Sequence, residues 1–214
     1  RFRLPMSEEQ AYEYLLAAYI MEVQLRYRRF IYNGFVEEQL KQVANCLTAN
    51  TAKFGIVLCG GCGNGKTTML KALQNLVRRL EILKPNLSPN AGHSSDNYYN
   101  FTIVNAMQIV QIRKTDYNKF CKLAEADILG IDDIGTEPAE VQDYGNFIYP
   151  IKELLAMRYD AQLFTVFTTI LEPKEIRQRY GDRIADRLNE MMTKVVYRNP
   201  TYRTENAQMA DSQG

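Results

Sequence analysis

Residues 59–68 read CGGCGNGKTT and contain two residue patterns that could each do chemistry. In the first, Gly60 and Gly65 are followed by Lys66 and Thr67, which is the GxxxxGK[ST] spacing of a phosphate-binding loop. Glycines let such a loop turn its N–H groups toward a phosphate, the lysine reaches the β- and γ-phosphates, and the threonine hydroxyl binds Mg²⁺. The pattern predicts a nucleotide-phosphate site made by Gly60, Gly61, Cys62, Gly63, Asn64, Gly65, Lys66, Thr67 and Thr68.

Cys59 and Cys62 form the second pattern, the CxxC spacing of a zinc half-site or a redox pair. Zinc would need two further ligands, but His93 lies in a polar stretch, and Cys46 and Cys121 have no partner nearby. A redox CxxC normally opens a helix directly, whereas Cys62 lies inside the phosphate turn. We therefore expect this stretch to bind phosphate, with Cys59 as a small core residue at a strand end.

Two adjacent carboxylates, Asp132 and Asp133, follow a buried strand-like run in ILGIDDIG. Ionised carboxylates at such a place need a compensating cation, and Mg²⁺ supplies one. We expect Asp132 to hold Mg²⁺ together with Thr67, and Asp133 to orient or deprotonate the attacking water. Aspartate reaches less far than glutamate in this second position, so slow hydrolysis is expected. A strand-end turn without a catalytic role is the alternative.

Strand-like and helix-like segments alternate around these motifs. Helices are predicted at 7–30, where Ser7 and Gln10 fit a capping box, and at 36–47. Strands are predicted at 54–59, 101–105, 127–133, 162–169 and 193–198, and the polar stretch 85–100 reads as a loop. Further helices are predicted at 67–80, 106–114, 117–126 and 146–160, with Pro150 near the start of the last, followed by a pair of short helices divided near Gly181.

This alternation predicts an α/β fold, with a central, mostly parallel five-stranded sheet between layers of helices, preceded by N-terminal helices. Sheets of this kind bind ligands at the carboxyl ends of their strands, where the glycine loop and the acid pair both fall. The 214 residues suit one such domain with an appendage. The first residue is not Met, so we expect further sequence upstream.

The composition narrows the setting of the protein. A net charge of +1 gives no global attraction to nucleic acid or lipid, so such binding would need a local patch. No apolar run approaches the roughly 20 residues that span a bilayer, so no membrane association is expected. Four cysteines without an export signal indicate a reducing cytoplasm.

Four segments resemble, in order and spacing, the DnaC/IstB-like branch of AAA+ ATPases: GGCGNGKTT, ILGIDDIGTE, IKELLAMRYDAQLFTVFTT and PKEIRQRYGDRIADRL. This branch contains bacterial replicative helicase loaders and transposition helper ATPases. The resemblance covers roughly residues 50–205, and RYGDRIADRL is its more discriminating part. It implies a P-loop ATPase domain at 49–214, with ATP and Mg²⁺ as cofactors, after a helical segment at 1–48 that links or binds a partner.

The resemblance also implies roles for three arginines. Arg187 matches the arginine finger that contacts a neighbouring subunit's ATP, with Arg183 as the second candidate, and Arg203 matches the sensor arginine that contacts the γ-phosphate within its own chain. Arginine suits the spread charge of a phosphoryl transition state, and residues four apart share a helix face. Surface ion pairs with neighbouring acids are the alternative for Arg183 and Arg187.

One position departs from the pattern of the family. The fourth strand usually ends in Ser/Thr-Asn-Leu, whose Asn positions the attacking water, but here Ile170 stands in the place of Asn. Isoleucine cannot form a hydrogen bond, so either Thr168 or Thr169 substitutes or catalysis is weak. We place Thr169 among the candidate catalytic residues with Lys66 and Asp133.

Basic side chains gather in three stretches. The segment 174–203 is locally basic, and the resemblance implies that Lys114, Lys119 and Lys122 with Tyr117 face single-stranded DNA. Solvated helix faces are the alternative for both stretches. The third, RYRRF at 26–30, is interpreted as a helix C-terminus favoured by the helix dipole, with partner or DNA contact left open.

The sequence thus predicts an ATPase of the replication helicase-loader type. ATP state would control assembly of a homo-oligomer and its hold on a replicative helicase or single-stranded DNA. A transposition helper that contacts a transposase shares these motifs. A nucleotide-dependent scaffold with little turnover is supported by Ile170. A small P-loop kinase fits less well, because the DDIG strand end and the late arginine pair favour an ATPase.

Overall fold

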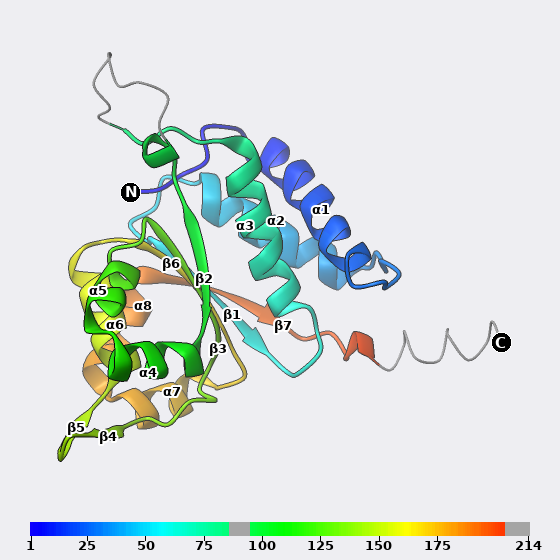
Figure 1. The fold of residues 1–214 in the computed structure, drawn as a ribbon. Helices are drawn as coiled ribbons and strands as arrows, with labels where there is room; N and C mark the ends of the chain where they lie inside the picture. Colours follow the sequence, from blue (N-terminus) through cyan, green and yellow to red (C-terminus); the bar gives the residue numbers. More distant parts are fainter. Residues whose placement is uncertain (86–94, 204–214) are drawn as a thin grey trace.

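The computed structural model describes residues 1–85 and 95–203. Its centre is a five-stranded sheet of order β2-β3-β6-β1-β7, and each neighbouring pair in it is parallel (Figure 1). The expected α/β fold with a central five-stranded sheet is therefore confirmed, and the sheet is entirely parallel. The strands are β1 (Gly55–Gly60), β2 (Phe101–Asn105), β3 (Ile128–Ile134), β6 (Phe164–Thr169) and β7 (Met192–Tyr197).

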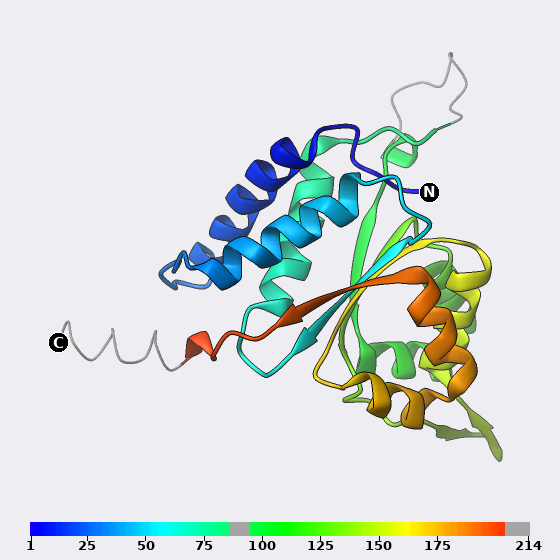
Figure 2. The same cartoon turned by 180° about the vertical axis from the view of Figure 1, so that it is seen from behind.

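Helices cover both faces of this sheet and give the molecule three layers (Figures 1 and 2). One face carries α1 (Glu8–Gln24), α2 (Gly34–Thr48) and α3 (Lys66–Leu80). The other carries α4 (Ala106–Thr115), α5 (Tyr117–Ala124), α6 (Pro150–Asp160), α7 (Pro173–Tyr180) and α8 (Asp182–Met191). A short 3₁₀ turn, η1 (Ser95–Asn97), precedes β2.

The N-terminal helices belong to the same apolar core as the sheet. Leu15 of α1 and Leu40 of α2 are fully buried in one cluster with Leu70 of α3, Ile56 of β1 and Val166 of β6. Burial of this apolar surface holds α2 on β7 and β1, and α1 on α2 and α3. The linker or partner-binding role expected for residues 1–48 stays a prediction.

The first helix begins as expected but ends earlier. The Gln10 amide donates to the Ser7 Oγ at 3.1 Å and the Ser7 amide to the Gln10 Oε1 at 3.2 Å, so the predicted capping box is present. The helix ends at Gln24, and Tyr27 has a φ of +54°, so the prediction of a helix to residue 30 is wrong. Residues 26–30 therefore belong to a loop between α1 and α2.

The helix predicted at 146–160 is also shorter, because a β-hairpin occupies its start. Strands β4 (Val141–Asp143) and β5 (Asn146–Ile148) pair antiparallel through a turn in which Tyr144 and Gly145 have φ of +46° and +86°. Helix α6 then begins at Pro150, in the first turn where the missing N–H costs nothing. Gly181, with a φ of +86°, separates α7 from α8 as expected.

A buried arginine lies at the amino end of β6, at the end of the sheet opposite the phosphate loop. Arg158 of α6 is fully buried and donates to the Thr165 hydroxyl at 2.8 Å and to the carbonyl oxygens of Ala124 and Phe164 at 2.9 and 2.7 Å. Burial lowers the pKa of Arg158 to about 9, so the guanidinium remains charged at neutral pH. Its hydrogen bonds join the end of α5 to the start of β6.

Part of the loop expected at 85–100, with His93, lies outside the described residues. Within the described ranges, no helix combines the length and apolar character needed to cross a bilayer.

Candidate nucleotide-binding site

The phosphate loop joins the carboxyl end of β1 to the first turn of α3. Gly63 and Gly65 have φ of +74° and +104°, which a residue with a Cβ adopts only with strain. A Cβ on Gly65 would also collide with the hydroxyl of Tyr19. Helix α3 begins at Lys66, so its positive dipole end and unpaired N–H groups face the loop, as an anion site requires.

Lys66 is buried at the mouth of this loop. Its Nζ donates to the Gly60 carbonyl oxygen at 2.7 Å, the Gly61 carbonyl oxygen at 2.5 Å and the Asn64 Oδ1 at 3.1 Å. Burial lowers the pKa of Lys66 because the charged form loses solvation. A phosphate oxygen is a stronger partner than these neutral oxygens, so the ammonium can exchange them for a phosphate.

The predicted magnesium residues meet below the loop. The Thr67 hydroxyl of α3 donates to the Asp132 Oδ1 of β3 at 3.0 Å, and the Thr168 hydroxyl of β6 donates to the same oxygen at 2.7 Å. Hydroxyl and carboxylate oxygens are the hard ligands that Mg²⁺ prefers. The donor set that the structure brings together therefore fits this metal.

Asp133 occupies a strained backbone position at the end of β3. Its φ is +59°, and the pairing of β3 with β6 shifts register between Ile131 and Ile134, which turns Asp133 out of the ladder. The Asp133 amide donates to the Thr168 hydroxyl at 2.8 Å. Burial and then the neighbouring Asp132 raise the pKa of Asp133, while Lys66 and Arg203 oppose this shift.

The two threonines considered as substitutes for the missing Asn take different positions. Thr168 contacts both aspartates, as described above. Thr169 donates instead to the Ile134 carbonyl oxygen at 2.7 Å and accepts from the Leu171 amide at 3.1 Å. Because its hydroxyl contacts backbone groups and neither aspartate, Thr169 is the weaker candidate. Ile170 itself is half exposed and lines the cavity described next.

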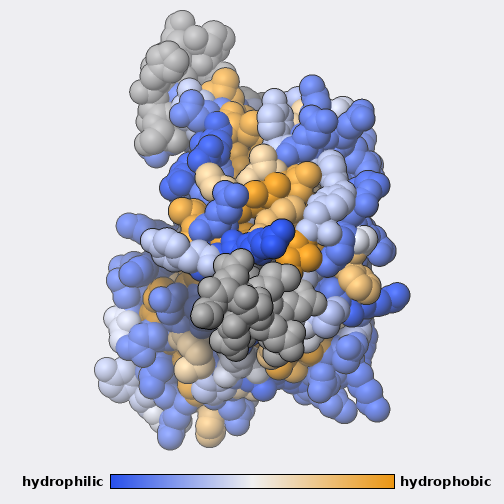
Figure 3. Space-filling model, turned by 90° about the vertical axis from the view of Figure 1, so that its right-hand side faces the viewer, coloured by the Kyte–Doolittle hydropathy of each residue, from blue (hydrophilic) through white to orange (hydrophobic). Residues whose placement is uncertain are grey.

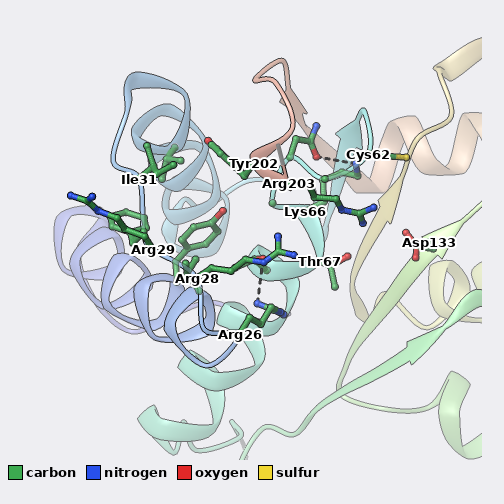
Figure 4. A pocket seen from close by; sticks show the side chains of 18 of the residues that line it. Arg26, Arg28, Arg29, Ile31, Cys62, Lys66, Thr67, Asp133, Tyr202 and Arg203 are labelled. Carbon is green, nitrogen blue, oxygen red and sulfur yellow. Dashed lines mark hydrogen bonds between the residues drawn. The ribbon is translucent and has the colours of Figure 1, made fainter. Parts of the chain in front are cut away.

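A cavity of about 440 Å³ opens beside the phosphate loop (Figure 4). That volume lies in the range of small-molecule sites. Tyr19, Val23, Phe30, Ile31 and Tyr202 form an apolar wall that suits a base. Asp133 lies on the side away from Ile31, with Lys66 and Arg203 between them (Figure 4). On the face where the described chain ends, apolar side chains are bordered by hydrophilic ones (Figure 3).

The end of the described chain is tied to the phosphate loop. The Tyr202 amide donates to the Gly63 carbonyl oxygen at 3.0 Å, and Arg203 lines the cavity on the side of Lys66 (Figure 4). The structure thus places the expected sensor arginine at the site of its own chain.

Arg183 and Arg187 do not line this cavity. The Arg187 guanidinium pairs with Asp160 at 3.0 Å and lies 4.6 Å from the centre of the Tyr159 ring. Arg183 is exposed and has no hydrogen bond or ion pair with another described residue. The neighbouring acids of α8, considered above as partners for these arginines, bind Arg177 instead: Asp182 at 2.6 Å and Asp186 at 2.7 Å.

The two cysteines of the CxxC pattern lie in different environments. Cys59 is buried at the end of β1, as expected, and its thiol lies 3.6 Å from the Val195 carbonyl oxygen. Burial raises the pKa of the Cys59 thiol, which keeps it protonated. Cys62 is exposed, and the described residues contain no cluster of metal-ligating side chains.

Sequence reasoning missed a buried carboxylate that joins the site to α7. Glu137, which is 1% exposed, accepts from the Tyr180 hydroxyl at 2.5 Å and from the Gly135 amide at 2.8 Å. Arg179 lies 3.6 Å from the same carboxylate. These contacts fix the loop after Asp133 to α7, and nothing local in the sequence marks Glu137 as buried.

No family model and no curated protein sequence matches the chain. Solved structures do resemble it. The crystal structure of DnaI matches 86% of this chain and 93% of its own, with 18% identity and a TM-score of 0.57. AMPPCP-bound DnaA from Aquifex aeolicus matches 86% of this chain but 53% of its own, with 17% identity and a TM-score of 0.55.

A third structure, of a protein described as a primosome component from Streptococcus pyogenes serotype M3, matches 81% of this chain and 85% of its own, with 15% identity and a TM-score of 0.57. At such identities the likeness establishes the fold. The chain therefore shares its fold with DnaI and with this primosome component, which agrees with the AAA+ P-loop fold that the sequence resemblance implies.

Proposed function

We propose that this protein is an AAA+ ATPase of the replication helicase-loader type. The observation that carries the proposal is the meeting of Thr67, Asp132 and Thr168 beneath a phosphate loop that opens into a cavity with an apolar wall. The fold shared with DnaI supports the loader role, and the DnaA structure solved with AMPPCP supports the use of a nucleotide triphosphate.

Each residue of the site has a distinct role in this proposal. Lys66 binds the β- and γ-phosphates, and Arg203 binds the γ-phosphate from the same chain. Thr67 and Asp132 would hold Mg²⁺, which neutralises phosphate charge when bound. Asp133 orients the attacking water and, with its raised pKa, takes a proton more readily than an ordinary aspartate.

Thr168 holds Asp132 and Asp133 in place. Of the two threonines on β6, it is therefore the one that contacts the residue proposed to orient the attacking water. Ile170 offers no polar atom where the family has Asn, so we expect slow turnover. A scaffold that binds ATP and hardly hydrolyses it remains the second candidate on this observation.

The proposed partners are a replicative helicase, single-stranded DNA and further copies of this chain, in the cytoplasm. Lys114, Lys119 and Lys122 are exposed on α4 and α5, which supports a DNA contact there. The Arg113 guanidinium lies 4.7 Å from the centre of the Tyr117 ring, and the Phe120 ring is stacked against Tyr117, so the lysines carry the proposed DNA contact. Capture of this protein by an immobilised replicative helicase would favour the loader function, and capture by an immobilised transposase would favour the transposition helper.

The affinity of the Lys66→Ala variant for ATP tests the assignment of the nucleotide site. We expect its affinity to fall at least about tenfold, since a charge-assisted contact to phosphate is lost. Lys71→Ala, an exposed lysine on the same helix, is the matched control and should bind like the wild type. Equal affinity of Lys66→Ala and the wild type would defeat the assignment.

A further inference from the structure

The loop between α1 and α2 forms one wall of the nucleotide cavity. Phe30 and Ile31 of this loop contribute to the apolar wall, and Arg26, Arg28 and Arg29 line the same cavity. A helix C-terminus was expected here, but α1 ends before these arginines. The loop therefore brings both apolar and cationic groups to the site.

Arg26 anchors this loop to the helix that follows the phosphate loop. It donates to the Thr68 hydroxyl at 3.3 Å and to the Glu22 carbonyl oxygen at 2.8 Å, and it pairs with the Glu22 carboxylate at 3.6 Å. Asn75 of α3 donates to the same carboxylate. The loop is thus fixed against the first turns of α3.

Arg28 extends from the anchored loop toward the start of α3, whereas Arg29 points the opposite way (Figure 4). Arg28 is exposed and forms no hydrogen bond or ion pair with any described residue. Lys66 and Arg203 stand beyond it, and Asp133 is the one carboxylate among the described residues that line the cavity. This excess of positive charge fits a polyanion larger than Lys66 alone would neutralise.

The position of the loop indicates which phosphates Arg28 meets. A nucleotide places its α-phosphate between the base and the terminal phosphates. The loop that carries Arg28 also supplies the wall for the base and touches Thr68, while Lys66 and Asp133 mark the γ end. Building on the proposed function, we infer that Arg28 binds the α- and β-phosphates of the nucleotide from the N-terminal side of the cavity.

A contact to the α- and β-phosphates has a distinct signature in binding. ATP and ADP share these groups, so loss of Arg28 weakens both by the same factor. Adenosine lacks them, so its weak binding is unchanged. A contact to the γ-phosphate would instead weaken ATP more than ADP.

The test compares Arg28→Ala with Lys71→Ala in titrations with ATP, ADP and adenosine. We expect Arg28→Ala to lose about tenfold in affinity for both ATP and ADP, as for one charge-assisted hydrogen bond, and to keep its affinity for adenosine. Lys71→Ala, an exposed cation of α3 that does not line the cavity, should match the wild type. Arg28→Lys, which keeps the charge, should recover part of the loss.

Three outcomes overturn the inference: wild-type affinity in Arg28→Ala, equal losses in Arg28→Ala and Lys71→Ala, or a loss for ATP without one for ADP. Lys66→Ala, measured in the same titrations, distinguishes a wrong role for Arg28 from a wrong assignment of the nucleotide site. If Lys66→Ala loses ATP binding while Arg28→Ala keeps it, the nucleotide site stands and the role of Arg28 falls. If Lys66→Ala binds normally, the proposed function fails as well.

Discussion

Asp133 is held in the charged site at a cost to the stability of the fold. Its raised pKa means that ionisation favours the unfolded chain, where an aspartate has its ordinary pKa of about 3.9. The stabilisation that this group contributes is therefore present in acid and is lost as the pH rises through the folded pKa. Sites that bind charged ligands commonly carry such a cost.

We expect Asp133→Asn to raise the unfolding temperature of the nucleotide-free protein by a few degrees at pH 8, and to abolish hydrolysis. The reason is removal of a partly buried charge beside Asp132, at a left-handed backbone position that Asn also tolerates. The gain should shrink as the pH falls from 8 toward 4, because the wild-type carboxyl then takes up a proton.

Thermal unfolding across this pH range, with Asp143→Asn of the hairpin as control, checks the prediction. A constant difference between Asp133→Asn and the wild type at all pH values would contradict it, since the effect would not then come from ionisation.

Spacing along the chain was enough to predict the residues of the phosphate loop and the acid pair. These groups act through local geometry, a turn and the end of one strand, which residue types encode directly. Thr168 was predicted only as one of two alternatives with Thr169, and Arg28 only as part of the basic stretch 26–30, so neither could be singled out in this way. Each meets the site only after distant segments come together, β6 beside β3 in one case and the α1–α2 loop beside α3 in the other.

At the scale of elements, the buried Glu137 connects the strand that carries Asp133 with the helix pair α7–α8. Its carboxylate is satisfied by the Tyr180 hydroxyl and the Gly135 amide, and burial raises the pKa of Tyr180, which keeps the hydroxyl a donor. These contacts join the loop after β3 to α7.

Tyr180→Phe should lower the free energy of unfolding by about 1–3 kcal/mol, because a buried carboxylate loses a donor without a replacement. Urea unfolding measures this cost, and Tyr144→Phe at the exposed hairpin tip should change it by less than about 0.5 kcal/mol. Since Tyr180 does not line the cavity, ATP affinity should stay close to that of the wild type. Equal free energies of unfolding for Tyr180→Phe and the wild type would show that the Tyr180–Glu137 hydrogen bond does not stabilise the fold.

Periodicity placed the central strands and most helices correctly, but it missed the hairpin of β4 and β5. These strands are three residues each, too short for alternation to register, and their exposed faces leave no apolar pattern. Gly145 and Pro150 were the available signals, a turn with positive φ and a helix start. The early end of α1 was hidden for a similar reason, since the charged residues 26–30 are compatible with a helix end or a loop.

At the scale of the whole molecule, the cavity proposed for the nucleotide is lined by Arg203 but by neither Arg183 nor Arg187. Phosphoryl transfer gains from a further arginine at the transition state, so a neighbouring copy would complete the site. The family resemblance favours Arg187, but that guanidinium is already paired with Asp160 and lies over Tyr159. Arg183 is exposed without a described partner, so it can contact another chain without breaking existing contacts.

We therefore expect turnover per chain in the wild type to rise with protein concentration, and Arg183→Ala to lower it at least about tenfold without loss of ATP affinity. Arg187→Ala, measured beside it, decides between the two candidates. Mixing gives the sharpest measurement, because a Lys66→Ala chain is expected to bind ATP poorly but still offers its arginines to a neighbour. Activity that returns when Arg183→Ala is mixed with Lys66→Ala places the arginine in trans. If activity returns only when Arg187→Ala is mixed with Lys66→Ala, the role belongs to Arg187. If neither mixture recovers activity and turnover per chain does not depend on protein concentration, each chain completes its own site.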